Sequence, residues 1–284
     1  MVPSYIIPGL TFPSNNARTT LPVAGTTLLI TDDLNSPAEF LLHVILSAHC
    51  SGSSQSAATI VTSKASAHWR DIALRMGSKA SQRLASGGVK FVDPAALLIH
   101  EPSAADGPKT PSPDWLLEKI FASLVEDCAA FPCSNGNAGL IILDDLNSLE
   151  WIGCSELNVV RFLRGVQALA RKVCPIWLKD CRHTTDNQVI PQNTRFLVVL
   201  LHIVASPESL RTFRHLVESC GVHIQVDGLV SGRSGAVSGE ISVHPGHRLQ
   251  DPHFAPRPKS NALHYRLNFS GPEYFDRGTG GGVL

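Results

Sequence analysis

Two pairs of neighbouring acidic residues have the types and spacing needed to bind a metal ion beside a phosphate group. Asp32 and Asp33 follow the apolar segment 26–31, and Asp144 and Asp145 follow the apolar segment 139–143. Short apolar runs of this kind are typical of buried strands, and the carboxyl ends of parallel strands meet at one edge of a sheet. Carboxylates at such an edge can hold Mg²⁺ during phosphoryl transfer. The spacing therefore indicates the outline of a nucleotide site.

The first of these loops lacks the residues that bind phosphate. A phosphate cradle uses backbone N–H groups freed by glycine and a lysine that reaches the phosphate oxygens. The segment from Asp32 to Ser36 contains neither glycine nor lysine. A carboxylate about 4 Å from a phosphate costs about 1 to 4 kcal/mol, depending on the local dielectric. We therefore expect a degenerate nucleotide site with no catalytic residue and no cofactor, formed by Asp32, Asp33, Asn35, Ser36, Asp144 and Asp145. An alternative is that Asp144 and Asp145 still hold Mg²⁺.

Composition limits the class of protein. A chain of 284 residues with 43% hydrophobic content can bury one large core. Basic and acidic residues number 24 each, so any contact with nucleic acid must be local. The seven scattered cysteines are typical of reduced thiols. Since no apolar run approaches the roughly 18 residues that a membrane span needs, we expect no membrane contact and a location in the cytoplasm, with the nucleus as a second compartment.

Alternating strands and helices position the acid pairs. We expect an N-terminal arm over 1–25 and a single domain over 26–284. Ser36 is the expected N-cap of the first helix, with Pro37 at its first position. Expected strands are 26–31, 57–62, 89–93, 139–143 and 196–204. After a further helix through about Ser219 come the strands 222–230, 239–244 and 262–269, with no helix between them. This pattern predicts an α/β fold, with a mostly parallel central sheet flanked by helices and a C-terminal antiparallel meander.

This order of elements resembles the core of the RecA-type P-loop ATPases, with the P-loop missing. Within that class the chain is similar to the sixth subunit of Elongator, the complex that modifies wobble uridines in tRNA. The likeness covers roughly residues 24 to 284. The segments that carry it are Leu140–Leu149, Cys154–Asn158, Gly228–Gly232 with Gly239–Ile241, and the tail Tyr274–Leu284.

The resemblance implies a non-catalytic RecA-like subunit, a pseudo-ATPase, in a hetero-hexameric ring. The ring would hold two copies each of Elongator subunits four, five and six, contact tRNA and dock on the Elongator catalytic subcomplex. One alternative is an active RecA or KaiC-type ATPase with a divergent nucleotide loop. Another is a RecA-like adaptor with no connection to tRNA.

Basic residues near two loops are the candidates for contact with tRNA phosphates, the alternative being ordinary solvated charge. They are Lys179, Arg182, His183 and Arg195, together with Arg211 and Arg214. For metals, His244, His247 and His253 lie in a Pro/Gly-rich turn without a cysteine or acid at zinc-ligand spacing. The sequence thus predicts no metal site.

Overall fold

The computed structural model describes most of the chain. The described residues are 6–14, 17–52, 57–99, 113–130, 138–171, 195–203, 207–229, 237–249 and 251–277, without the side chains of 14, 17 and 207–210. Within these ranges, no helix is long and apolar enough to cross a lipid bilayer.

A nine-stranded sheet forms the centre of the molecule, in the order β11-β10-β9-β8-β3-β7-β6-β4-β5. Its strands are β3 (Thr27–Asp32), β4 (Ala58–Thr62), β5 (Val89–Val92), β6 (Gly139–Asp144), β7 (Arg195–His202), β8 (Val222–Asp227), β9 (Gly239–Pro245), β10 (Leu263–Asn268) and β11 (Gly271–Phe275). Neighbours from β8 to β5 pair in parallel, whereas β8, β9, β10 and β11 pair antiparallel. The predicted fold class, a mostly parallel sheet extended by an antiparallel meander, is confirmed.

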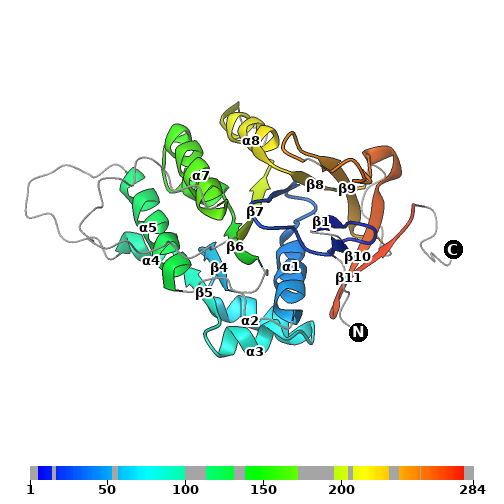
Figure 1. Cartoon of the computed structure of the whole chain (residues 1–284), viewed down its shortest axis with the longest axis horizontal. Coiled ribbons are helices and arrows are strands. Elements are labelled where there is room, and N and C mark those ends of the chain that lie inside the picture. Colours follow the sequence, from blue (N-terminus) through cyan, green and yellow to red (C-terminus); the bar gives the residue numbers. More distant parts are fainter. Residues whose placement is uncertain are drawn as a thin grey trace, which may run out of the picture.

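Helices cover both faces of the parallel part (Figure 1). Their bounds are α1 (Glu39–Ser51), α2 (Ser66–Arg75), α3 (Ala80–Ala85), α4 (Pro94–Ile99), α5 (Asp114–Ala130), α6 (Asn147–Trp151), α7 (Glu156–Ala170) and α8 (Pro207–Ser219), with a 3-10 turn at Lys259–Asn261. Helices α1, α2 and α3 pack on one face, and α5, α7 and α8 pack on the other.

The alternation of side chains along each central strand explains the two layers. Leu28 and Ile30 of β3 join the core under α1, while Leu29 between them joins the core under α7. Successive strand residues point to opposite faces, so a strand covered on both sides is apolar throughout. Each fully buried leucine or isoleucine contributes about 1.5 to 3 kcal/mol.

The N-terminal segment packs against the body of the protein. Strands β1 (Phe12–Ser14) and β2 (Ala17–Thr19) form a small hairpin. Ile6, Ile7 and Phe12 are buried in the same core as α1, and the hydroxyl of Tyr274 donates to the carbonyl of Ile6 at 2.9 Å. The expected arm therefore shares its apolar core with the sheet.

Candidate functional site

The two predicted acid pairs meet at the carboxyl edge of the sheet. Strand β7 lies between β3 and β6, and Asp32 is in register with His202 at the end of β7. The acid-bearing loops that follow β3 and β6 therefore flank His202. In open α/β sheets this edge is where ligands bind.

Asp32 caps helix α1 from inside the protein. Its side chain is fully buried, and its Oδ2 accepts a hydrogen bond of 2.6 Å from the backbone N–H of Ala38. Ala38 is the N-cap of α1 and makes no capping bond with its own side chain, so the prediction that Ser36 caps this helix is wrong. The positive end of a helix dipole attracts anions. Here the anion is the protein's own carboxylate.

His202 joins the two acid pairs. Its Nδ1 lies 2.5 Å from Oδ1 of Asp32, and its Nε2 lies 3.2 Å from Oδ2 of Asp145. Hydrogen bonds to Asp145 and to Asp32 raise the pKa of His202 to about 10, although burial lowers it. The ring is therefore an imidazolium at neutral pH, and both nitrogens donate to carboxylates. We call Asp32, His202 and Asp145 the histidine clamp.

The backbone of the clamp is held by Asn147. The side-chain amide of Asn147 donates to the carbonyl of His202 at 3.1 Å, and its oxygen accepts from the N–H of His202 at 2.7 Å. The strand pairing between β3 and β7 fixes the same residue from the other side. This double anchoring keeps the imidazolium between the two carboxylates.

Asp33 and Asp145 shape their own loops. Oδ1 of Asp33 accepts from the N–H groups of Asn35 and Ser36, both at 2.8 Å. Oδ1 of Asp145 accepts from the N–H of Ser148 at 2.7 Å. Such bonds are the usual way in which Asp stabilises a turn. Hydrogen bonds within the chain thus already engage these carboxylates.

A lysine from a different loop reaches Asp144. Nζ of Lys64, which follows β4, lies 3.1 Å from Oδ1 of Asp144 and 3.0 Å from Oε2 of Glu39. The hydroxyl of Thr62 donates to Asp144 at 3.0 Å. Burial raises the pKa of Asp144, and Lys64 opposes that rise. Burial lowers the pKa of Lys64, but the two carboxylates raise it by more. Lys64 thus lies beside the second acid pair, and its ammonium group forms ion pairs with two carboxylates.

Sequence reasoning missed both His202 and Lys64. His202 is a polar residue at the end of the apolar run 196–204, which is the position where a parallel strand delivers its side chains to a ligand edge. That signal was available. Lys64 gave no comparable signal, because only the pairing of β4 with β6 brings it to Asp144.

The predicted tRNA contacts are scattered. Arg195 is fully buried, and its Nη2 donates to the carbonyl of Asp127 at 3.2 Å. This burial argues against a direct contact with tRNA. Arg211 is exposed, 3.9 Å from Glu156, and Arg214 is exposed. Lys179, Arg182 and His183 lie outside the described residues.

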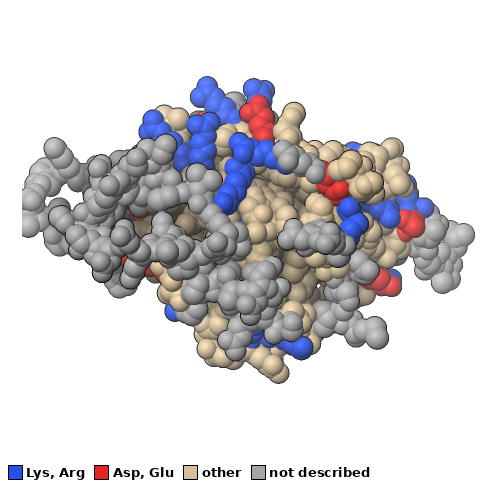
Figure 2. Space-filling view, viewed as in Figure 1, with Lys and Arg blue, Asp and Glu red and all other residues tan. Residues whose placement is uncertain are grey.

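A different basic surface lies at the amino end of the sheet. A groove of about 450 Å³, which we call the arginine groove, is lined by Arg164, Arg171, His215 and Arg248 together with one acidic residue, Glu218. A second cavity of about 600 Å³ shares Arg171 and Arg248 with it. Burial lowers the pKa of Arg171, and the charge of Arg248 lowers it further. Figure 2 shows basic side chains gathered on this part of the surface, over α7 and α8. The positive field there suits an anion.

Several large apolar side chains are exposed on segments that follow the strands at the carboxyl edge or continue from them. They are Leu34, Trp151, Leu157 and Ile203. Leu34 lies in the loop capped by Asp33, and the N–H of Ile203 donates to the carbonyl of Asp32 at 2.8 Å. Trp151 ends α6, which begins at Asn147. Other large apolar side chains are exposed on different segments, at Leu74, Ile99, Leu267 and Phe269. Exposed apolar side chains are suited to protein contact where they form a contiguous patch.

Comparison with known proteins establishes the fold. No protein-family model matches the sequence, and no curated protein matches it. Among solved structures, the chain is similar to the KaiC-like protein PH0186 from the hyperthermophilic archaeon Pyrococcus horikoshii OT3, with a TM-score of 0.56 and 10% sequence identity. The match covers 89% of this chain and 90% of that one. The chain therefore has an α/β fold of the RecA and KaiC type.

Proposed function

We propose that this chain is a non-catalytic, RecA-like subunit of a ring assembly, and that the ring is the hetero-hexamer of Elongator subunits four, five and six. The observation that carries the proposal is the histidine clamp. In a fold of the KaiC type, the edge suited to nucleotide binding is here filled by Asp32, His202 and Asp145. The sequence resemblance to the sixth Elongator subunit supplies the identity of the partners.

The clamp disfavours nucleotide on electrostatic grounds. A phosphate at the start of α1 would meet the buried carboxylate of Asp32, which already accepts the N–H of Ala38. To bind there, it would have to displace Asp32 from His202 and leave that carboxylate without its cation. Breaking a buried ion pair in this way costs about 3 to 5 kcal/mol.

The exposed apolar side chains support an assembly. Leu34, Trp151, Leu157 and Ile203 belong to segments at the carboxyl edge, where a neighbouring subunit of a ring would cover them. Obligate interfaces are large and rich in apolar area. We propose this edge as the face that meets subunit four or five.

For tRNA, the arginine groove replaces Arg195 as the candidate surface. Arg164, Arg171 and Arg248 come from different parts of the chain and converge on one cavity, as a phosphate site requires. In this proposal the ring supports tRNA handling by the catalytic subcomplex, while this chain contributes shape and positive charge.

Nucleotide titration of the isolated chain tests the non-catalytic role. We expect no saturable binding of MgATP at concentrations up to millimolar and no ATP hydrolysis. Micromolar affinity or turnover would favour the alternative, an active KaiC-type ATPase with a divergent loop.

Assembly is tested by purifying the chain together with Elongator subunits four and five and measuring the mass of the complex. Leu34→Glu and Leu157→Glu should each reduce assembly, because they place a charge in the proposed interface. Leu74→Glu, at an exposed leucine of α2, is the matched control. If Leu34→Glu and Leu157→Glu both assemble as well as the control, the carboxyl edge is not the interface.

The tRNA contact is tested by salt dependence in the assembled ring. Arg171→Ala with Arg248→Ala should weaken binding and lower the slope of log K against log salt by about 2, roughly one for each phosphate that the protein no longer neutralises. Arg70→Ala, at an exposed arginine of α2, is the control. An unchanged slope in the double variant would remove the arginine groove from the proposal.

A further inference from the structure

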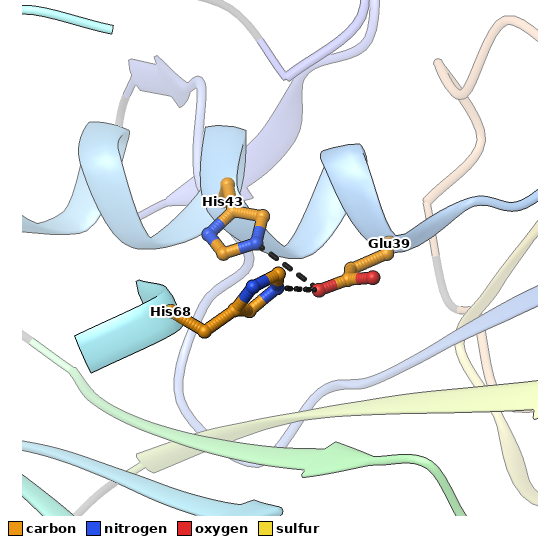
Figure 3. A group of neighbouring side chains, drawn as sticks. All are labelled: Glu39, His43 and His68. Atoms are coloured by element: carbon orange, nitrogen blue, oxygen red, sulfur yellow. Dashed lines mark hydrogen bonds and ion pairs between the residues drawn. The ribbon is translucent and has the colours of Figure 1, made fainter. Parts of the chain in front are cut away.

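A cluster of two histidines and one glutamate lies beside the carboxyl edge, where α1 meets α2. Glu39 and His43 stand one turn apart on α1, and His68 extends from the first turn of α2 (Figure 3). Nε2 of His68 lies 2.6 Å from Oε1 of Glu39, and Nε2 of His43 lies 3.4 Å from the same oxygen. The three side chains offer one ligand atom each, and these atoms all lie within 4.8 Å of one another.

Packing orients the cluster. The side chain of His43 is 3% exposed, and its ring lies 4.4 Å from the ring of Trp69, measured between centroids. His68 is 44% exposed and so is free to adjust its rotamer. Residues four apart on a helix face the same side, which points Glu39 and His43 toward the same space. A fixed pair and an adjustable third ligand make a site that can close around an ion.

Two of the three separations between ligand atoms can be compared with those around a tetrahedral metal, and the third, between His43 and His68, is within 4.8 Å. A Zn²⁺ ion about 2.0 to 2.1 Å from each nitrogen and oxygen ligand places those ligand atoms about 3.3 Å apart. The separation of 3.4 Å between His43 and Glu39 already has this value. His68, at 2.6 Å from Glu39, must withdraw by less than about 1 Å, a small rotation for an exposed side chain.

We propose that Glu39, His43 and His68 form a Zn²⁺ site with its fourth coordination position open. Two imidazoles and one carboxylate are the ligand set of open zinc sites, whereas Mg²⁺ and Ca²⁺ prefer oxygen ligands throughout. The sequence prediction of no metal site rested on His244, His247 and His253, which lie in β9 and the loops after it. This site does not depend on the proposed role in a ring.

Lys64 leaves the metal-facing oxygen of Glu39 available. Its Nζ contacts Oε2 of Glu39 at 3.0 Å, while both imidazoles approach Oε1. Glu39 can therefore bind the ion through one oxygen and stay oriented by Lys64 through the other.

The cluster adjoins a cavity. Glu39 and His43 line a cavity of about 540 Å³, together with Phe40 and Arg75. Arg75 places a positive charge in the same wall. A water molecule or a small carboxylate could therefore complete the coordination from this side.

Metal titration of the whole chain tests the site. After treatment with chelator, the protein is titrated with Zn²⁺ by calorimetry and with Co²⁺ by visible absorption. We expect one equivalent of each, with the Co²⁺ bands of a four-coordinate site and without the charge-transfer band of a thiolate ligand. His68→Ala should weaken Zn²⁺ binding at least about 100-fold, because even residues outside the ligand set cost 10 to 100-fold when removed.

Two further variants make the result decisive. His68→Cys should restore tight binding, since a thiolate also binds Zn²⁺, and should add the thiolate band to the Co²⁺ spectrum. His253→Ala, at an exposed histidine outside the cluster, should bind as the unmodified chain does. Circular dichroism should show that all three variants are folded. Failure to bind one equivalent, retention of tight binding by His68→Ala, or a thiolate band in the unmodified chain would each overturn the proposal.

Discussion

Replacing His202 with glutamine should destabilise the protein most below neutral pH and progressively less as the pH rises. The imidazolium lies between Asp145 and Asp32, and their hydrogen bonds raise its pKa to about 10. A group whose pKa is higher in the folded state stabilises that state while both states are protonated. The stabilisation is fully present below the unfolded pKa and is lost as the pH rises through the folded value.

The size of the effect follows from the two pKa values. Since the pKa of His202 rises from 6.5 to about 10, and one unit corresponds to 1.36 kcal/mol, the upper limit is about 5 kcal/mol. The side chain is 19% exposed, and partial solvation reduces the figure, so we expect about 2 to 4 kcal/mol. Glutamine can donate to only one of the two carboxylates, so the variant also leaves two like charges close together.

The assay is chemical denaturation of both proteins at several pH values between 6 and 10.5. The difference in unfolding free energy should be largest near pH 6 and should shrink steadily above pH 6.5. Groups that do not interact with residue 202 cancel in this difference. His253→Gln, at an exposed histidine, is the control and should show no such trend. A difference that is constant with pH would show that His202 acts through packing alone, and the charged clamp would be refuted.

Three other substitutions test the packing and the charges around the sheet. Gly246→Ala should lower the free energy of unfolding by at least about 2 kcal/mol, measured by thermal or chemical denaturation. A Cβ at this position would lie 2.7 Å from Sγ of Cys220 and closer still to the carbonyl oxygen of Cys220. Gly52→Ala is the control and should change the free energy of unfolding little, because the atom nearest to its Cβ would be 3.6 Å away. Arg195→Met should lower the free energy of unfolding by about 2 to 4 kcal/mol, because it leaves the polar partners of a buried guanidinium without a hydrogen-bond donor. Arg214→Met at the surface is the control and should change the free energy of unfolding by no more than about 0.5 kcal/mol. Burial, together with the charge of His244, lowers the pKa of His223 to about 4. The free energy of unfolding should therefore fall by up to about 3 kcal/mol as the pH falls from 6.5 to about 4, because the unfolded chain binds the proton more tightly. Denaturation of His223→Gln over the same pH range should show a smaller fall.

The sequence predicted the sheet well because its central strands are apolar on both faces. The ranges 139–143 and 196–204 each begin within one residue of β6 and β7, because a strand covered on both faces is apolar along its whole length. Short elements were missed, among them α3, α6 and β11. Their few residues carry little periodicity, and contacts from distant parts of the chain stabilise them.

For the site, sequence located the acids and misjudged their partners. Asp32 and Asp144 lie at the predicted edge, but the sequence assigned the cap of α1 to Ser36. Asp32, six positions before the N-cap residue Ala38, provides that bond instead, because the loop folds back on itself. The pairing of Lys64 with Asp144 joins residues 80 positions apart. Local capping rules contain no information about either contact.

The capped start of α1 has a consequence for how this chain could change over evolutionary time. The carboxylate of Asp32 at the helix end belongs to the same chain, so its effective concentration there is high at any protein concentration. An anion from solution must therefore compete with Asp32 for this position. Losing Asp32 alone would leave the imidazolium of His202 without its nearer counter-ion, and losing His202 alone would leave two carboxylates facing each other. Each single step passes through a less stable protein, while both together need not. A change at this helix end that preserves stability therefore requires paired substitutions on β3 and β7, two strands that are distant in sequence.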